Sequence, residues 1–515
     1  MTPMEAIVPL LVALPLLTAA GIVAMAHVRP LAKFTSGVAV GVVAVNLVLS
    51  LVLLPARVGP IYIGGWSAAS TLGIQINCDA LAKLMLITVN LVALASLVFS
   101  LSYMRQFTKV WMFMSLLVFM VAAMNALVLA GDLFNLFVFL EVAAIASYAL
   151  VAFGCEAEEL EAAFKYLVLG TVGSTLILLG VGILYSLTGQ LNMGLVAAGL
   201  RKLTLAGGKV GPAPLLAAAC LIGGLALKAA MVPFHAWLPD AHPSAPAPIS
   251  AMLSGVLIKA SGVYAMARVV FNVLGPSGPY ATVLMTLGAL SMVVGVLLAV
   301  GQWDFKRLLA YHSISQMGYV VLALGAAAHV LSGPSPQVAV ASVCLLGALF
   351  HLFNHAAFKS LLFLSSGAIE QQAHTRMLKE MGGLARRMPV TGFCCRIAAL
   401  SIAGVPPFNG FFSKLIIIVG LAMAGYPVLA ALAAFVAFVT LLSFVKVQRY
   451  ALEGQPSASA AAAHEAPFSM GLAMVVLAVI CLLAGPGMMV LRDWLFEPAG
   501  RVLMAGSAAL IGGAP

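Results

Sequence analysis

Charged side chains are scarce in this sequence. Only 8% of its 515 residues are Asp, Glu, Lys or Arg and 63% are hydrophobic, whereas soluble domains carry about 25% charged residues. This composition excludes an ordinary soluble domain and predicts a chain surrounded mostly by lipid. The formal net charge of +10 does not indicate nucleic acid as a partner, because the basic residues lie mainly in loops between apolar segments.

Metal and cofactor motifs are missing as well. The seven cysteines have neither CxxC nor metal-finger spacing, so the sequence indicates neither an iron–sulfur cluster nor a zinc site. It also lacks a nucleotide-binding loop, a flavin fingerprint and a haem-ligating pattern. We therefore expect no cofactor, no metal site and no catalytic redox centre in this chain, so that any oxidoreductase reaction belongs to partner subunits.

Long apolar segments are abundant instead. A hydrocarbon core of about 30 Å needs about 20 apolar residues per helix, and dividing the chain on that length predicts an all-α integral membrane protein with about fourteen transmembrane helices. The expected ranges are 5–26, 31–54, 79–103, 110–130, 132–153, 162–187, 213–238, 248–272, 280–301, 305–328, 337–366, 389–424, 427–450 and 467–490. A Gly-, Trp- and Ser-rich stretch at 57–78 predicts a short exposed hairpin.

Two short stretches recur in the same order. Residues 162–165 and 356–359 both read Ala-Ala-Phe-Lys, and Val-Pro-Phe at 232–234 is similar to Pro-Pro-Phe at 406–408. Transporters are often built from weakly similar repeats, so we predict a duplicated unit of helices four to eight and nine to thirteen, with proline breaks in the seventh and twelfth. The resulting parts of the chain are 1–109, 110–272, 280–450 and 451–515.

Basic residues also predict the orientation of the chain. The loops that follow odd-numbered helices hold more Lys and Arg than the loops that follow even-numbered helices. By the positive-inside rule, the odd-numbered loops face the cytoplasm. We therefore expect a multi-pass protein with both termini on the outer side of the membrane.

A few ionisable side chains lie deep within the predicted helices, where each costs about 2.5–3.5 kcal/mol on insertion scales and is usually functional. Glu141 follows Asp132 by nine residues, which places it about 13 Å into its helix at about 1.5 Å per residue. Three lysines and two histidines occupy similarly deep positions. The candidate set is Glu141, Lys228, Lys259, His351, His355 and Lys414, with His235, Lys359 and Asp132 as secondary members.

The spacing of these residues suggests shared faces. His351 and His355 are one helical turn apart, and Lys359 continues their face. For His235, in the proline-containing stretch after Lys228, a functional and a structural role are both open. We expect ordinary structural roles, at loops, helix ends or between prolines, for three further histidines: His242, His312 and His374. A structural pair is expected between Asp79 and Lys83, four residues apart.

Two interpretations of the buried charges are open. In the first, Glu141 and Lys228 form a structural ion pair that fixes helix packing and never changes its protonation. In the second, the whole set forms a proton relay. Desolvation lowers the pKa of a buried amine and a nearby carboxylate raises it. Movement of the carboxylate therefore makes the amine release or keep its proton. Positive groups outnumber the single deep carboxylate. Mutual neutralisation cannot account for this excess of positive groups, and the excess favours the relay.

Six stretches of this sequence resemble the motifs of one superfamily. They are GDLFNLFVFLEV at 131–142, LKAAMVPFHAWLP at 227–239, LIK at 257–259, KRLLAY at 306–311, HLFNHAAFK at 351–359 and AGVPPFNGFFSK at 403–414. They are similar to the antiporter-like, proton-translocating membrane subunits of complex I, Mrp antiporters and membrane-bound hydrogenases. DLFNLFVF at 132–139 and MGGL at 381–384 look closest to the Mrp D-type subunit and related hydrogenase subunits.

The resemblance implies a fold and a set of roles. The fold is fourteen helices with two inverted five-helix repeats, in which helices seven and twelve are broken. Glu141 and Lys228 would form the ion pair of the first half-channel, with Lys259 as the link inward. His351 and His355 would form the central polar axis. Lys414 would be the exit-side group, where family members divide between lysine and glutamate.

The implied function is proton translocation in a multi-subunit complex of a prokaryotic cell membrane. Either Mrp-type sodium/proton antiport or pumping driven by a hydrogenase or quinone oxidoreductase partner fits the motifs. The expected partners are other membrane subunits, homologous antiporter-like subunits among them, together with lipid, protons and sodium. The alternatives are a structural membrane anchor without an ion path of its own and a stand-alone secondary transporter of an organic solute.

Overall fold

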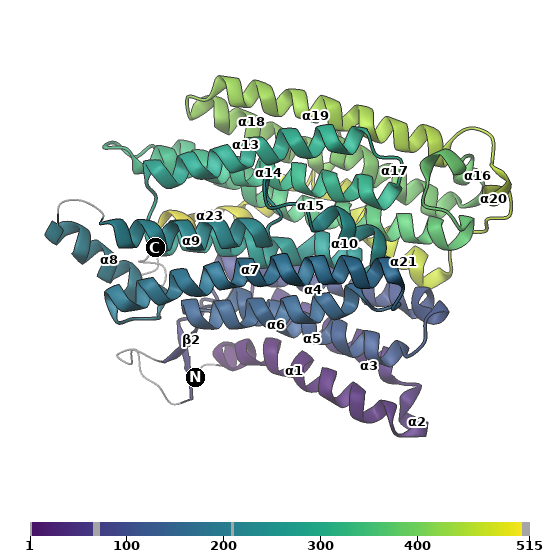
Figure 1. Cartoon of the computed structure of the whole chain (residues 1–515), viewed down its shortest axis with the longest axis horizontal. Helices are drawn as coiled ribbons and strands as arrows, with labels where there is room; N and C mark the ends of the chain where they lie inside the picture. Colours follow the sequence, from purple (N-terminus) through teal and green to yellow (C-terminus); the bar gives the residue numbers. More distant parts are fainter. Residues whose placement is uncertain (1–2, 65–72, 208–210, 507–515) are drawn as a thin grey trace.

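A computed structural model describes residues 3–64, 73–207 and 211–506. The described part is a bundle of long helices that run mainly along the long axis of the molecule (Figure 1). Among the described helices, eleven are long and apolar enough to cross a membrane, or twelve if the bent pair Phe468–Leu483 and Met488–Met504 is one span. The all-α membrane architecture predicted from composition is therefore confirmed.

The first half of the chain holds helices and one small hairpin. Its elements are α1 (Pro3–Ala26), α2 (Arg29–Ala32), α3 (Thr35–Val52), β1 (Ile61–Ile63), β2 (Ile74–Ile76), α4 (Ala80–Tyr103), α5 (Val110–Leu129), α6 (Leu133–Val151), α7 (Ala157–Thr188), α8 (Met193–Gly207), α9 (Pro212–Lys228), α10 (Leu238–Ser244) and α11 (Ala247–Met252). Helix α11 continues as η2 (Leu253–Tyr264), α12 (Ala265–Ala267) and η3 (Arg268–Leu274), of which η2 and η3 are π-helical.

The second half is helical throughout its described elements. They are α13 (Gly278–Val300), α14 (Phe305–Ser332), α15 (Val338–Ala373), α16 (Leu384–Arg387), α17 (Pro389–Ala403), α18 (Asn409–Met423), α19 (Pro427–Val447), α20 (Ala458–Ala461), α21 (Phe468–Leu483), α22 (Met488–Leu491) and α23 (Glu497–Met504). Helix α15 lies at the centre of the bundle, in contact with α4, α11, α14, α17, α18 and α21.

Both predicted helix breaks are present. Helix α9 ends at Lys228, and the chain resumes as a helix only at Leu238; α17 and α18 are separated by residues 404–408. Proline lacks the backbone N–H that a continuing helix would use, and each break contains one cis peptide bond, Val232–Pro233 and Pro406–Pro407. At the first break the last carbonyls of α9 accept from the backbone N–H groups of residues 229–231, which turn the chain away from the helix axis.

Aspartates begin several of the long helices. Asp79 accepts from the N–H of Ala82, Asp132 from that of Asn135 and Asp304 from that of Arg307, at 2.9, 2.7 and 2.9 Å. A side-chain oxygen at this position satisfies one of the free N–H groups of the first turn. Asp132 thus has a capping role at α6, and its membership of the relay stays a prediction.

The hairpin and two helix limits differ from the expectations. Ile61 pairs with Ile76 in an antiparallel ladder, but the base is not exposed, because the carbonyl of Gln75 accepts from Gly131 N at 2.9 Å beside α6. Residues 65–72 of the predicted hairpin lie outside the described residues. Helix α7 begins before residue 162, at Ala157, because a capping box starts it. Helix α8 was not predicted, since it is short and carries Arg201 and Lys202.

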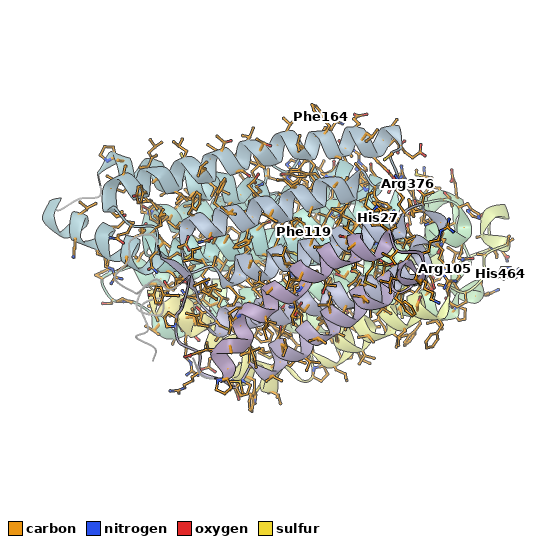
Figure 2. All side chains as sticks on the ribbon, turned by 90° about the horizontal axis from the view of Figure 1, so that it is seen from below. His27, Arg105, Phe119, Phe164, Arg376 and His464 are labelled. Atoms are coloured by element: carbon orange, nitrogen blue, oxygen red, sulfur yellow. The ribbon has the colours of Figure 1, made fainter. Side chains whose placement is uncertain are left out.

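The two ends of the bundle differ in their charged groups. Figure 2 places His27, Arg105, Arg376 and His464 toward one end, and Phe119 nearer the middle. The strands and α8 lie at the opposite end, where α1 begins (Figure 1). Arg105 and Arg376 belong to two different odd-numbered loops, so the structure brings these loops to a common end of the molecule.

Candidate functional site

The first candidate pair meets where three helices converge. Glu141 lies on α6, and its Oε1 is 3.0 Å from Nζ of Lys228, the last residue of α9. Ser174 of α7 donates a further hydrogen bond to the same carboxylate oxygen. The Lys228 side chain is buried, whereas the Glu141 side chain is 25% exposed. The structure thus brings together the pair that the sequence predicted.

Aromatic residues brace the break that follows Lys228. The indole N–H of Trp237 donates to the Leu227 carbonyl at 3.1 Å, which also accepts from the backbone N–H of Ala230 at 3.0 Å. The Trp237 ring stacks on Tyr166 at 4.1 Å, and Tyr166 meets Tyr148 edge to face at 4.5 Å. Trp237 therefore fixes the end of α9 from the far side of the break. In the sequence, Trp237 was noted only as part of the motif at 227–239.

Lys259 lies in the π-helical segment η2 and is fully buried. Its ammonium donates to the backbone carbonyl of Ser254, one residue further back than an α-helical partner. The segment packs closely on the first break, because a Cβ added to Gly262 would lie 2.5 Å from the Cα of Ala229. Lys259 is thereby held beside the backbone that follows Lys228.

The central histidines share one face of α15, as their spacing predicted. The rings of His351 and His355 are 6.4 Å apart, and His351 Nδ1 is hydrogen-bonded to Ser413 Oγ of α18 at 2.9 Å. Lys359 is fully buried one turn further and donates to the Leu309 carbonyl of α14. Both ring nitrogens of His355 and Nε2 of His351 are buried without a hydrogen-bond partner in the described structure.

Lys414 lies on α18, just beyond the second break. Its Nζ donates to the Ile402 carbonyl at 2.7 Å, which is one of the free carbonyl groups at the end of α17. The same ammonium lies 5.2 Å from the centre of the Tyr319 ring of α14, within the range of a cation–π contact. Both broken helices therefore carry a buried lysine at or directly after the break.

Three of the secondary expectations need correction or remain open. His312 is not a polar helix-end residue: it is fully buried within α14, and its Nε2 is 2.8 Å from Ser443 Oγ of α19. The ion pair of Asp79 is with Arg268 at 2.5 Å, and Lys83 donates to the Ala56 carbonyl instead. His235 lies within the break, partly buried, where no regular helical face connects it to Lys228.

The reason for the His312 error is the packing of a helix that lies far away in the sequence. Seven residues separate His312 from the start of α14 at Phe305, which looked too shallow for burial. Helix α19 covers this turn, and the Phe444 ring lies 4.8 Å from the imidazole. His242 does take the buried place between prolines that was expected, stacked on Phe363 at 4.5 Å.

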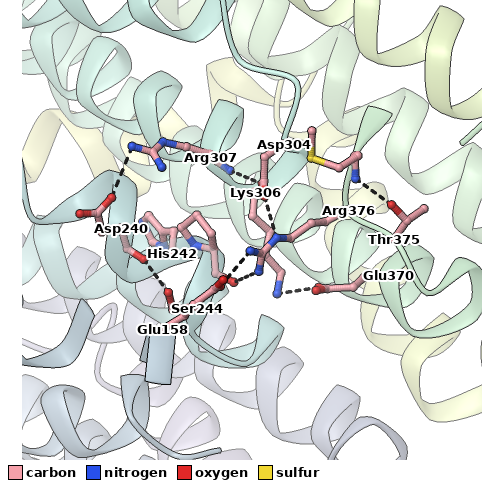
Figure 3. Close-up of polar contacts among 12 residues, drawn as sticks. Glu158, Asp240, His242, Ser244, Asp304, Lys306, Arg307, Glu370, Thr375 and Arg376 are labelled. Carbon is pink, nitrogen blue, oxygen red and sulfur yellow. Dashed lines mark hydrogen bonds and ion pairs between the residues drawn. The ribbon is translucent and has the colours of Figure 1, made fainter. Parts of the chain in front are cut away.

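A second group of charges, here called the end cluster, lies at the Arg376 end of the bundle (Figure 3). It joins α7 and α10 to α14 and to the segment after α15. Its ion pairs are Arg376 with Asp304 at 2.7 Å, Arg376 with Glu158 at 3.1 Å, Lys306 with Glu370 at 2.6 Å, Arg307 with Asp240 at 3.4 Å and Lys165 with Asp240 at 3.1 Å.

Arg376 is the branching residue of the end cluster. Burial lowers the pKa of its guanidinium, but the carboxylates of Asp304, Glu158 and Glu370 outweigh this effect and raise the pKa above its ordinary value. The side chain thus stays charged at any physiological pH. A cavity of about 420 Å³ adjoins the end cluster and is lined in part by Glu159, Lys306 and Glu370. Among all the described residues, no group of His, Cys, Asp or Glu is suited to a metal ion.

Comparisons with known proteins converge on one group. A family model described as NADH:quinone oxidoreductase/Mrp antiporter, TM, matches residues 130–440. The D-type subunit of the Na(+)/H(+) antiporter of Alkalihalophilus pseudofirmus is 34% identical over 453 residues, which cover 87% of each chain. Hydrogenase-4 component B of Escherichia coli is 35% identical over 430 residues, which cover 80% of this chain and 62% of that protein.

The structural comparison agrees. A chain in the solved structure of the Mrp complex from Dietzia sp. DQ12-45-1b is similar to this chain with a TM-score of 0.88 at 27% sequence identity, and the match covers 100% of both chains. The similarity includes the whole bundle rather than the family segment alone.

Proposed function

Because this chain belongs to the NADH:quinone oxidoreductase/Mrp antiporter transmembrane family, we propose that it translocates protons across a prokaryotic membrane as one subunit of a multi-subunit complex. The observation that carries this proposal is the 3.0 Å pair of Glu141 and Lys228 at the break of α9. Ionisable side chains inside a membrane helix bundle are costly, pair with one another, and mark ion pathways and proton relays. The break supplies backbone that is free to rearrange.

The proposed relay runs through nine side chains. Its principal members are Glu141, Lys228, Lys259, His351, His355 and Lys414, and its secondary members are His235, Lys359 and Asp132. When the Glu141 carboxylate moves away from Lys228, the amine loses the partner that stabilises its charge and releases its proton inward. When the carboxylate returns, Lys228 takes up the next proton. A partner subunit or a counter-moving ion would bias this two-state element.

Buried polar atoms support a hydrated path between these groups. The free ring nitrogens of His351 and His355, together with both polar side-chain atoms of Gln316, are buried without a partner in the described structure. Buried polar groups in native proteins are nearly always hydrogen-bonded to protein or to ordered water. Water between these side chains would connect the lysines of the relay.

The finer architecture is part of the same proposal. If the broken helices α9–α10 and α17–α18 and the bent helix α21 each complete one span, they join the eleven long helices to make fourteen. We assign α5 to η3 and α13 to η5 (Gln448–Leu452) as two inverted five-helix repeats, within parts 110–272 and 280–450. Parts 1–109 and 451–515 flank them. We place both termini outside the cell and the end cluster in the cytoplasm.

The partners follow from the relatives. The solved neighbour is part of an Mrp complex, and the named relatives are an antiporter subunit and a hydrogenase component. We propose that this chain assembles with other membrane subunits, including homologous antiporter-like subunits, and that it works either in sodium/proton antiport or in redox-driven pumping. The partly exposed Glu141 would then be covered by a neighbouring subunit.

Proton transport by the complete complex in sealed vesicles tests the proposal. We expect Glu141→Ala and Lys228→Ala each to slow proton uptake by about tenfold or more, because each removes a group that carries or controls the proton. The matched control is the exposed pair of Glu161 and Lys165 on α7, 2.8 Å apart, whose alanine variants should transport normally. Undiminished transport by both relay variants would favour the structural anchor without an ion path.

Loss of assembly would be a separate outcome. Removing one partner of a buried pair costs about 3–5 kcal/mol in proteins, so the amount of each variant in the purified complex must be measured. Glu141→Gln keeps the shape of the side chain and a hydrogen bond from Ser174 while it removes the charge. An assembled Glu141→Gln complex that transports normally would overturn the proposed role of Glu141.

A further inference from the structure

The buried histidine of α14, His312, suggests a second proton route that the relay described above does not include. His312 is fully buried, about 10 Å from the start of its helix at about 1.5 Å per residue. Its Nε2 is 2.8 Å from Ser443 Oγ of α19, whereas its Nδ1 is buried without a partner in the described structure. One ring nitrogen is thus engaged and the other is available.

Lys359, on the central helix α15, is the nearest described lysine of the relay along this face of α14. The ammonium of Lys359 donates to the carbonyl of Leu309, three residues before His312 on the same helix, so its charge lies at the turn next to the ring. Three cations act on the imidazole, namely Lys359, Lys414 and Lys446. No carboxylate is among the charged groups that act on it in the described part of the chain.

On the outer side of His312, α19 leads to the end of the bundle. Ser443 is buried, and Lys446 follows it by three residues, which places both on one face of the helix. Lys446 is partly buried, and its Nζ donates to the carbonyls of Val300 and Gln302 at 2.7 and 2.6 Å. These carbonyls lie at the last residue of α13 and in the loop between α13 and α14, which also carries Asp304 of the end cluster.

We propose that His312 and Ser443 form a side branch that carries protons between Lys359 in the core and Lys446 at the end of the bundle. This inference rests on the proposed proton relay and adds to it an access route in the second half of the chain. The branch has a ring nitrogen without a partner, a hydroxyl that is hydrogen-bonded to the other ring nitrogen, and an amine near the end of α19. Each of these groups exchanges protons with its neighbours or with intervening water.

The proton transfer can be followed group by group. Lys359 gives one proton to Nδ1 of neutral His312, directly or through water, and becomes a neutral amine. The imidazolium then passes its Nε2 proton to Ser443 Oγ while the hydroxyl proton of Ser443 moves to Lys446, which accepts it as a neutral amine after giving a proton to the solution at the end of the bundle. Ring rotation or a water that joins the two nitrogens returns His312 to its first tautomer. No charge is created, and the same steps in reverse bring a proton inward.

A purely structural histidine is less consistent with the surroundings. Gln316, one turn further along α14, also has both polar side-chain atoms buried without a partner. A face on which both His312 and Gln316 retain unpaired groups is typical of a water-lined passage. A packing role would need only one hydrogen bond to Ser443 and the Phe444 contact at 4.8 Å.

Transport by the complete complex in vesicles tests the branch. We expect His312→Gln to slow proton transport by about tenfold and Ser443→Ala by about threefold, since general acid–base groups contribute such factors or more. The double variant should be no slower than His312→Gln alone, because both residues serve one route. The matched control is His329→Gln, an exposed histidine of the same helix, which should leave transport unchanged.

Lys446→Arg separates a relay role from a structural one. Arginine keeps the positive charge and the donors for the two loop carbonyls, but it does not release a proton in proteins. We expect Lys446→Arg to slow transport about as much as His312→Gln. Normal transport by assembled His312→Gln and Lys446→Arg complexes would overturn the branch.

The failure of the branch is distinguishable from the failure of the main proposal. If Glu141→Ala and Lys228→Ala abolish transport while His312→Gln and Lys446→Arg leave it intact, the relay stands and the branch does not. If all four variants transport normally, both are wrong. Where His312→Gln reduces assembly, Ser443→Ala decides the branch, because it removes one hydroxyl and leaves the ring in place.

Discussion

The two broken helices hold their lysines in different ways. At the first break, Lys228 is paired with a carboxylate, and the oxygen that it contacts also accepts from Ser174. At the second break, Lys414 donates to the carbonyl of Ile402 and lies over the Tyr319 ring. Lys259 and Lys359 also donate to backbone carbonyls. Within the described residues, only Lys228 of these four lysines has an anionic partner.

The difference suggests that the two breaks have different roles. A carboxylate that can move changes the proton affinity of its amine, so the first break can act as a switch. A carbonyl group is neutral and fixed by its helix, so Lys414 responds mainly to the water and the charges around it. The first half would set the timing of proton transfer, and the second half would follow it.

The largest expected effect is at the second break. Lys414→Met should abolish proton transport, a loss of about a hundredfold or more, because the proposed relay has no other member on α17 or α18. Lys414→Arg should be nearly as inactive, since arginine keeps the charge but does not release a proton. Vesicle transport measures both, with exposed Lys33→Met as the control. Normal transport by Lys414→Arg would show that only a fixed charge is needed there.

An intermediate effect is expected from exchanging the partners of the first pair. Glu141→Lys and Lys228→Glu alone each bring two like charges together and should prevent transport or assembly. The double variant restores opposite charges at the same sites, so it should recover assembly and roughly a tenth of normal transport. Recovery of assembly without any transport would show that the order of the two groups matters, which sharpens the contrast with the second break.

The smallest effect is expected outside the relay, at the end cluster. Arg376 is partly exposed, so Arg376→Ala should lower the free energy of unfolding by about 1 kcal/mol or less. The loss should shrink in about 1 M salt, where ions screen exposed charges. Thermal unfolding of the complex at low and high salt measures it. A large loss of transport instead would mean that the two halves are coupled through this cluster and would remove the contrast drawn above.

Some of these features follow from the sequence alone. Glu141 and Lys228 were selected by their depth in apolar helices and were expected to pair from the family resemblance, and the structure confirms their contact. The prolines at 233 and 406–407 predicted both breaks, because proline removes a donor wherever it stands. The family was identified from the same motifs. These features depend on local chemistry, which a single stretch of sequence contains.

Other features depend on contacts between distant segments. His312 was expected at a helix end because nothing in α14 itself indicates that α19 covers it. Asp79 was expected to pair with Lys83, four residues away, whereas its partner Arg268 lies 189 residues further along the chain. The π-helical geometry around Lys259 was likewise not indicated by the spacing of its residues. Spacing along one helix could not have predicted any of the three.

One glycine sets the clearance between two lysine-bearing segments. Gly262 lies one turn after Lys259 and touches the backbone of Ala229, the residue directly after Lys228, so closely that a methyl group would collide with it. The separation of the two lysines is therefore fixed by the smallest side chain available. This contact limits how closely the two segments approach, and any larger residue at 262 would push the segment of Lys259 away from the end of α9.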